Sequence, residues 1–349
     1  MTREELLGLL DRGEVVSGAA LAGDVLEGID LGGLTFEGCT FAGASFTGTR
    51  LKESTFAQCV FADAVFTGVD MHHTFFHRCD LHEARFPGAK LTMARFVESR
   101  LTRADLRGAS AANLTVVDCD LSGADLSGVP IDRVNVLTTK VDGARFSGST
   151  FVKANFVDVD LREAHLDGVT WDRVVLHKVN LAGKVFAGLD LRMTQLMEAE
   201  LAGCDFSGAR LDRSNFKGSR LAGARFDGAS VKNVLFVEAA LADASFREAD
   251  LHQCIFMGAS CPRADFTKAK LYQTVWHRAS CEGALFVDGD LTYADFSWAD
   301  LTRADFRGST LTRARFHKTK EEGAHFPLRI AALGDDEELA RAEDFKPPH

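Results

Sequence analysis

Long apolar runs are missing from this 349-residue chain. Its longest uninterrupted apolar stretches are only a few residues, whereas a membrane-spanning helix needs about 20. We therefore expect no membrane span. The first residues, Met1 to Glu5, are acidic and precede no long apolar segment, so the sequence predicts no secretory signal and a cytoplasmic location. Export by a signal-independent secretion system stays open.

An excess of positive charge is also missing. The chain has 40 Lys and Arg against 50 Asp and Glu, a net charge of −10. Direct binding of nucleic acid depends on cations that neutralise phosphates, so we expect no direct nucleic acid binding. Aromatic residues that carry a polar group are scarce, with 2 Tyr and 3 Trp against 27 Phe, which indicates that most aromatic rings are buried.

A repeat of five residues accounts for most of the chain. Every fifth residue from Leu21 to Phe316 is apolar, over sixty positions without insertion or deletion. We call these positions centres. The residue two before each centre is usually small, as in Ala104-Asp105-Leu106 and Ala154-Asn155-Phe156. A period of five fits neither a helix nor an ordinary strand, and a repeat of this kind indicates a solenoid.

This A-(D/N)-(L/F)-x-x pattern resembles the pentapeptide-repeat family over about residues 19 to 326. The resemblance implies an all-β fold, a right-handed quadrilateral β-helix in which each pentapeptide forms one side. About fifteen coils would stack at about 4.8 Å. We expect a capping helix within residues 1–18, the β-helix at 19–326, and a C-terminal cap and tail at 327–349 with a short helix near 335–343.

Sorting the centres by a 20-residue turn supports four sides, which we name by their first centres. The Leu26 side contains 11 Phe in 15 centres, the Phe36 side contains 10, and the Leu21 and Leu31 sides contain 2 and 1. Phe thus recurs on two opposite sides, where rings can stack. Ala111 is a small centre, and we expect the inward Leu114 to fill the space that it leaves.

The cysteines and histidines are the candidate metal or redox sites of the sequence. Cys39, Cys59 and Cys79 lie 20 residues apart, as do Cys261 and Cys281. They could form a disulfide or metal ladder, but they occupy inward positions and no CxxC pair is present, so we predict reduced structural thiols. The cluster of His72, His73, His77 and His82 should point out of different sides, and we predict solvated histidines. We expect no catalytic residues, no metal and no cofactor.

The outward positions beside the centres are more informative. On the Phe36 side, twelve of them carry a large apolar side chain, far more than on the two most polar sides. This predicts a protein-binding stripe. The stripe consists of Phe75, Val97, Val117, Leu137, Val157, Val175, Met197, Leu235, Val237, Ile255, Met257 and Val275.

The sequence leaves three functions open, none of them enzymatic. The first is an interaction rod or scaffold that binds an unknown protein partner or a second copy as a homodimer. The second is a DNA mimic, because some pentapeptide-repeat proteins protect DNA gyrase from quinolones. Residues 21–320 have 35 basic and 38 acidic residues, a sparse negative charge for a mimic. The third, suggested by Leu6-Leu7-x-Leu9-Leu10 before the repeats, is an accessory or effector of type VI secretion.

Overall fold

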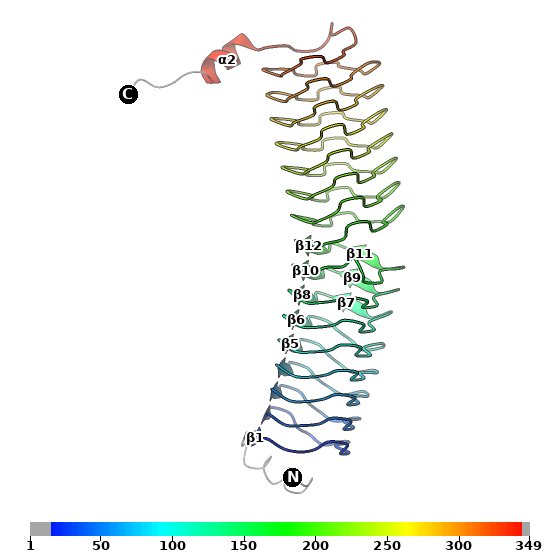
Figure 1. Cartoon of the computed structure of the whole chain (residues 1–349), viewed down its shortest axis with the longest axis vertical. Helices are drawn as coiled ribbons and strands as arrows, with labels where there is room; N and C mark the ends of the chain where they lie inside the picture. Colours follow the sequence, from blue (N-terminus) through cyan, green and yellow to red (C-terminus); the bar gives the residue numbers. More distant parts are fainter. Residues whose placement is uncertain (1–14, 344–349) are drawn as a thin grey trace, which may run out of the picture. The chain divides into compact units, whose positions relative to one another are not determined.

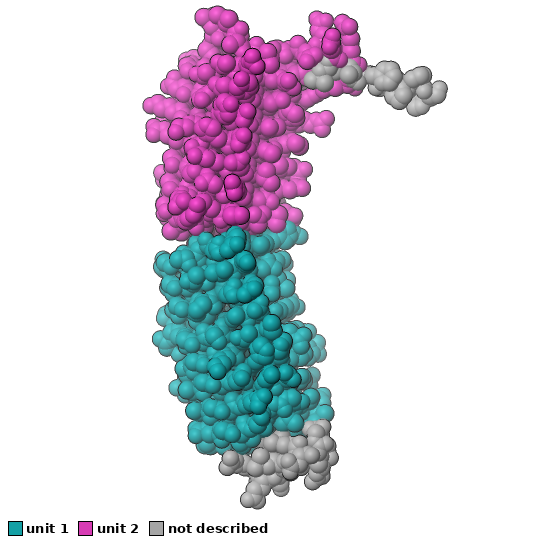
Figure 2. Space-filling view, turned by 180° about the vertical axis from the view of Figure 1, so that it is seen from behind, with its two compact units in different colours: residues 1–180 teal, residues 181–349 magenta. Residues whose placement is uncertain are grey.

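The computed structural model describes residues 15–343, and the expected N-terminal helix and the last six residues lie outside this range. The chain divides into two compact units, residues 1–180 (unit 1) and 181–349 (unit 2), which Figure 2 colours separately. Each unit is a stack of coils (Figure 1).

Unit 1 is a parallel β-solenoid. Partner residues are 20 apart, as in Phe36↔Phe56 and Phe156↔Leu176. The Phe36 side forms a nine-stranded parallel sheet, so unit 1 contains about eight turns. Its strands are β1 (Val16–Ser17), β2 (Thr35–Glu37), β3 (Thr55–Ala57), β4 (Phe75–His77), β5 (Arg95–Val97), β6 (Thr115–Val117), β8 (Asn135–Leu137), β10 (Asn155–Val157) and β12 (Val175–His177). On the Leu31 side, β7 (Pro130–Asp132), β9 (Thr150–Val152) and β11 (Thr170–Asp172) form a second parallel sheet.

Unit 2 keeps the same 20-residue register with single-residue bridges, from Val185↔Asp205 to Asp305↔His325. Its last pairing, Arg315↔Leu333, spans 18 residues and belongs to the C-terminal cap. The helix expected near 335–343 is α2 (Glu337–Glu343). No helix within residues 15–343 has the length and apolar character needed to cross a membrane. The expected all-β solenoid class is therefore confirmed, whereas an unbroken coil across residue 180 stays a prediction.

The centres form the core of each unit, as the repeat predicted. Every centre from Leu21 to Phe316 is buried except Leu166, which is half-buried. Phe rings stack within a column, as in Phe226 and Phe246, whose centroids are 4.6 Å apart with 2° between the planes. Rings of the two opposite Phe columns meet edge to face, as in Phe226 and Phe236 at 5.8 Å and 87°. The interior is thus filled by side chains. Ala111 and Leu114 are both buried as expected.

The corners follow from one backbone rule. The residue two after each centre has a positive φ, except Glu163, and glycine occupies 24 of these positions, for example Gly223 at φ 63°. At most corners the residue three after the centre donates its N–H to the centre's carbonyl, as in Ala44 N to Phe41 O at 2.9 Å. This is the pattern of a type II turn, whose third residue needs positive φ.

The Phe36 side of unit 1 departs from this rule. There the N–H groups after the corner bond to side chains of the next coil instead: Cys79 N to Ser99 Oγ at 3.0 Å, Ser99 N to Cys119 Sγ at 3.4 Å and Cys119 N to Thr139 Oγ1 at 3.3 Å. The inward column of Cys, Ser and Thr therefore satisfies backbone donors, which explains its polar residues in an apolar core.

Candidate functional site

The predicted stripe is present as two groups of neighbouring residues, one in each unit. In unit 1, consecutive strands pair Val97 with Val117, Val117 with Leu137, and Leu137 with Val157. We call these four residues the unit 1 patch. All four side chains are half-buried by their neighbours above and below, so the patch is a flat apolar row with no pocket of its own.

The second group lies in unit 2. Leu235 pairs with Ile255 and Ile255 with Val275, while Val237 and Met257 are on adjacent coils, since Glu238 N donates to Met257 O. We call these five residues the unit 2 patch. Two of them are its most accessible side chains, Met257 at 45% and Leu235 at 36% exposed.

The remaining three stripe residues stand apart. The guanidinium of Arg95 covers the ring of Phe75, with Arg95 Cζ 4.7 Å from the ring centroid. Val175 pairs with the polar Asn155. Lys217 bonds through its carbonyl to Glu198 N, and so it separates Met197 from the unit 2 patch. The twelve residues therefore do not form one uninterrupted apolar stripe, because polar residues interrupt it within each unit.

Outside the patches, the surface carries alternating charges. On the Leu21 side of unit 1, bridges connect Asp80 to Arg100, Arg100 to Asp120 and Asp120 to Lys140. Opposite charges on adjacent strands attract each other. The same alternation occurs in unit 2, where Arg210 lies 3.5 Å from Asp190. The pKa of Asp190 lies below its usual value, mainly because the Arg192 side chain donates hydrogen bonds to it.

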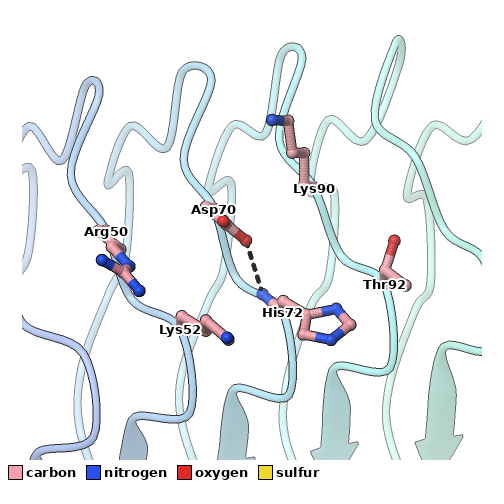
Figure 3. Close-up of a pocket in the computed structure, with 6 residues that line it drawn as sticks. All are labelled: Arg50, Lys52, Asp70, His72, Lys90 and Thr92. Carbon is pink, nitrogen blue, oxygen red and sulfur yellow. Dashed lines mark hydrogen bonds between the residues drawn. The ribbon is translucent and has the colours of Figure 1, made fainter.

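A shallow hollow of about 350 Å³ lies on the Leu31 side of unit 1 (Figure 3). Asp70 accepts the backbone N–H of His72 at 3.1 Å there. Two of the three cations have partners next to the hollow, since Arg50 lies 3.3 Å from Asp30 and Lys52 lies 3.5 Å from Glu53. The positive charge is thus largely neutralised, and the lining shows no nucleophile beside a general base. The residues lining the hollow are Arg50, Lys52, Asp70, His72, Lys90 and Thr92.

The histidines that the sequence predicts to be solvated contact polar side chains on the surface. His77 lies 3.6 Å from Glu98, while His82 contacts Thr102 at 2.7 Å. Within residues 15–343, no group of three His, Cys, Asp or Glu could hold a metal ion.

All eight cysteines are buried free thiols. Desolvation by burial raises the pKa of Cys119 and of Cys204 to about 11 in each case. Both thiols therefore stay protonated at neutral pH, and a protonated thiol is a poor nucleophile.

Two features of unit 2 go beyond the sequence prediction. Tyr272 and Tyr293, the chain's two tyrosines, contact each other on the Leu31 side of unit 2, with ring centroids 5.8 Å apart. The other is the contact of α2 with the Phe36 side of unit 2. There Glu343 Oε2 lies 3.2 Å from both His317 Nε2 and Lys318 Nζ. Counting corner positions would have revealed Tyr293, but nothing in the repeat predicts where α2 docks.

These observations define a class, a four-sided parallel β-solenoid with its chemistry on the outside. The family model described as pentapeptide repeats (8 copies) matches residues 89–128, 139–168, 154–192, 194–233, 235–273 and 279–317. The chain belongs to the pentapeptide-repeat family. A second model, the SV2A/B/C luminal domain, matches residues 31–106. No curated protein matches the chain.

Several solved structures are similar to it. A trypsin-treated variant of QnrB1, a plasmid-mediated fluoroquinolone resistance protein, is 22% identical over 57% of this chain and 92% of its own, with a TM-score of 0.42. HetL, involved in heterocyst differentiation regulation in the cyanobacterium Nostoc, is 22% identical over 90% of this chain and 96% of its own, with a TM-score of 0.17. A thylakoid-lumen pentapeptide repeat protein of Arabidopsis thaliana is 28% identical over 41% and 74%, with a TM-score of 0.12. Similarities this low do not transfer a function.

Proposed function

We propose that this chain is a non-enzymatic interaction scaffold that binds a protein partner or a second copy of itself through its outward apolar patches. The observation that carries the proposal is the gathering of large apolar side chains on one side of each unit. Scattered surface hydrophobic residues are normal in any protein, whereas neighbouring ones indicate an interaction site. The filled interior and the neutralised hollow leave the outer surface as the place of recognition.

The DNA-mimic alternative gains no support from the surface. A mimic needs a dense field of one sign. Here Arg100 and Lys140 alternate with Asp80 and Asp120 along one side, and such alternation cancels the field within a few ångströms of the surface. The sequence motif behind the type VI alternative falls among residues 1–14, outside the described range.

The test compares two double substitutions in unit 1. Leu137→Glu with Val157→Glu places charges on the unit 1 patch. Ala42→Glu with Ala62→Glu places them at half-buried outward positions of the Leu21 side. We expect only the first pair to change the solution mass or to abolish capture of a partner, as measured by sedimentation equilibrium and affinity capture. If both folded variants behave as the parent protein in both assays, unit 1 is not an interaction surface.

A further inference from the structure

We propose that the unit 2 patch, with the adjoining tyrosine corner, docks an acidic amphipathic helix of another protein. The inference rests on the proposed function and narrows it to one surface and one partner chemistry. Three independent features of unit 2 support it: the side chains that continue the patch, the charge of its rim, and the way in which the chain's own acidic helix binds the same side.

The unit 2 patch continues around a corner into aromatic and amide side chains. Gln253 and Gln273 follow one another at that corner, joined by a 3.0 Å hydrogen bond from Nε2 to Oε1. They are two residues before Ile255 and Val275 of the patch. Beside them Tyr272 contacts Tyr293. Aliphatic residues next to tyrosines are typical of the centre of a protein interface.

The rim of this surface is positive. Arg213, Lys217, Arg278 and Arg313 are exposed, and none of them has a carboxylate within 4.0 Å in the described part of the chain. Arg313 is instead over the Tyr293 ring, with Cζ 5.8 Å from the centroid. Glu198 and Glu238 are the exposed carboxylates at the corners of the same side, so the four cations outnumber them.

Asp295, a further acidic residue on this side, is already engaged, since it lies 3.0 Å from His277 and 3.8 Å from Arg315. Charge complementarity therefore selects a partner that carries carboxylates.

The chain itself shows how the Phe36 side receives such a helix. Its acidic C-terminal helix α2 (Glu337–Glu343) docks on this side through Glu343, which contacts His317 and Lys318. Lys318 Nζ also lies 4.5 Å from the centroid of the Trp298 ring. An acidic helix on aromatic and basic side chains is thus an arrangement that this side of unit 2 already makes.

The size of the surface decides between a helix and a broad protein face. The three coils of the unit 2 patch are two spacings of about 4.8 Å apart, about 10 Å in all. This width matches the diameter of one helix, about 10–12 Å. The area of a surface this narrow is far smaller than that of a standard protein–protein interface. We therefore expect weak, reversible binding of a short segment.

The experiment uses three synthetic helical peptides of about 18 residues, five turns, with leucine on one face and Glu, Lys or Gln on the other. Their binding to the full-length chain is measured by fluorescence anisotropy. Val237→Glu with Met257→Glu disrupts the patch, and Lys217→Glu with Arg278→Glu reverses the rim charge. The matched control is Ala202→Glu with Ala222→Glu, at exposed positions of the Leu21 side of unit 2. Circular dichroism confirms the fold of each variant.

We expect the Glu peptide to bind most tightly and to lose at least about tenfold in affinity with either patch or rim variant, but not with the control. The rim variant should bind the Lys peptide best. Equal binding of the Glu and Lys peptides, no binding at about 1 mM, or equal loss in the control overturns the inference. If the Gln peptide binds as well as the Glu peptide and only the patch variant weakens both, the scaffold proposal stands and the acidic partner falls. If the parent protein is a dimer and the patch variant is a monomer, a second copy of the chain binds the patch instead of an acidic helix.

Discussion

At the scale of single residues, the division between inward and outward positions explains most of the sequence. Inward centres carry Leu and Phe because these positions are buried and the rings stack at regular intervals. Phe226 is fully buried, stacks on Phe206 and Phe246, and meets Phe216 and Phe236 edge to face.

Phe226→Ala should destabilise the protein by about 3–5 kcal/mol, because the substitution removes buried surface and leaves a cavity among four rings. Arg247→Ala should cost less than about 1 kcal/mol. Arg247 is exposed, and its 2.7 Å ion pair with Asp265 is screened by solvent. Urea unfolding followed by circular dichroism gives both values. Similar shifts for the two variants would contradict the inward placement of the centres.

The buried thiols make a second prediction at this scale. Burial raises the pKa of Cys119 and Cys204 to about 11, so the reactive thiolate is rare at pH 7 to 8. Folded protein should react with a thiol reagent such as DTNB far more slowly than urea-unfolded protein. Because the folded pKa is raised, the stabilisation from these two groups is complete below about pH 8.5 and declines towards pH 11. Rapid labelling of the folded protein at pH 7.5 would show that the thiols are accessible.

At the scale of the element, the side-chain ladder of the Phe36 side in unit 1 can be tested with two serines. Ser99 Oγ accepts the buried N–H of Cys79 at 3.0 Å. Ser149 Oγ only donates, to Leu126 O at 2.8 Å, and that carbonyl also accepts Val129 N. Ser99→Ala leaves a buried donor unpaired and should cost about 1–3 kcal/mol, whereas Ser149→Ala should cost about 1 or less. Chemical unfolding compares them, and an equal cost would mean that the ladder does not stabilise the coil.

The corner is the second element that can be tested. Gly223 has a φ of 63°, and a Cβ added there would meet no atom within 4 Å. A substitution therefore reports backbone conformation alone. Gly223→Val should destabilise unit 2 by about 1–2 kcal/mol because a β-branched residue resists positive φ, while Gly223→Asn should cost well under about 1 kcal/mol. Thermal melts of the two variants measure the difference. Equal melting temperatures would show that this corner does not impose its conformation.

The sequence predicted the register, the two Phe columns and the inward residues, because a five-residue period without gaps allows one placement for each. It could not predict the class of turn at each corner. Cys119 and Cys204 are both inward cysteines after a corner, yet Cys204 N donates to Leu201 O whereas Cys119 N donates to Thr139 Oγ1. That choice depends on the next coil, 20 residues away. The interruptions of the stripe and the position of α2 likewise depend on contacts between residues far apart in the sequence.

At the scale of the whole chain, the repeat places nearly all chemical variety on the outside. Acidic and basic residues alternate along a column, as from Asp80 to Lys140, and so stabilise the stacked coils without creating a strong field. What distinguishes one surface from another is the apolar content of the Phe36 side, together with the tyrosine corner of unit 2. Recognition of a protein partner is therefore the role that this surface favours, and its test is a measurement that reports position as well as binding.

That measurement is site-specific photo-cross-linking in the cells that produce the protein. A benzophenone side chain replaces Leu137 or Met257 in the two patches, and Ala62 or Ala222 at outward positions of the Leu21 side as matched controls. We expect a discrete cross-linked protein, a partner or a second copy, from a patch position and none from the controls. The same products from all four positions, or none from either patch, would contradict it.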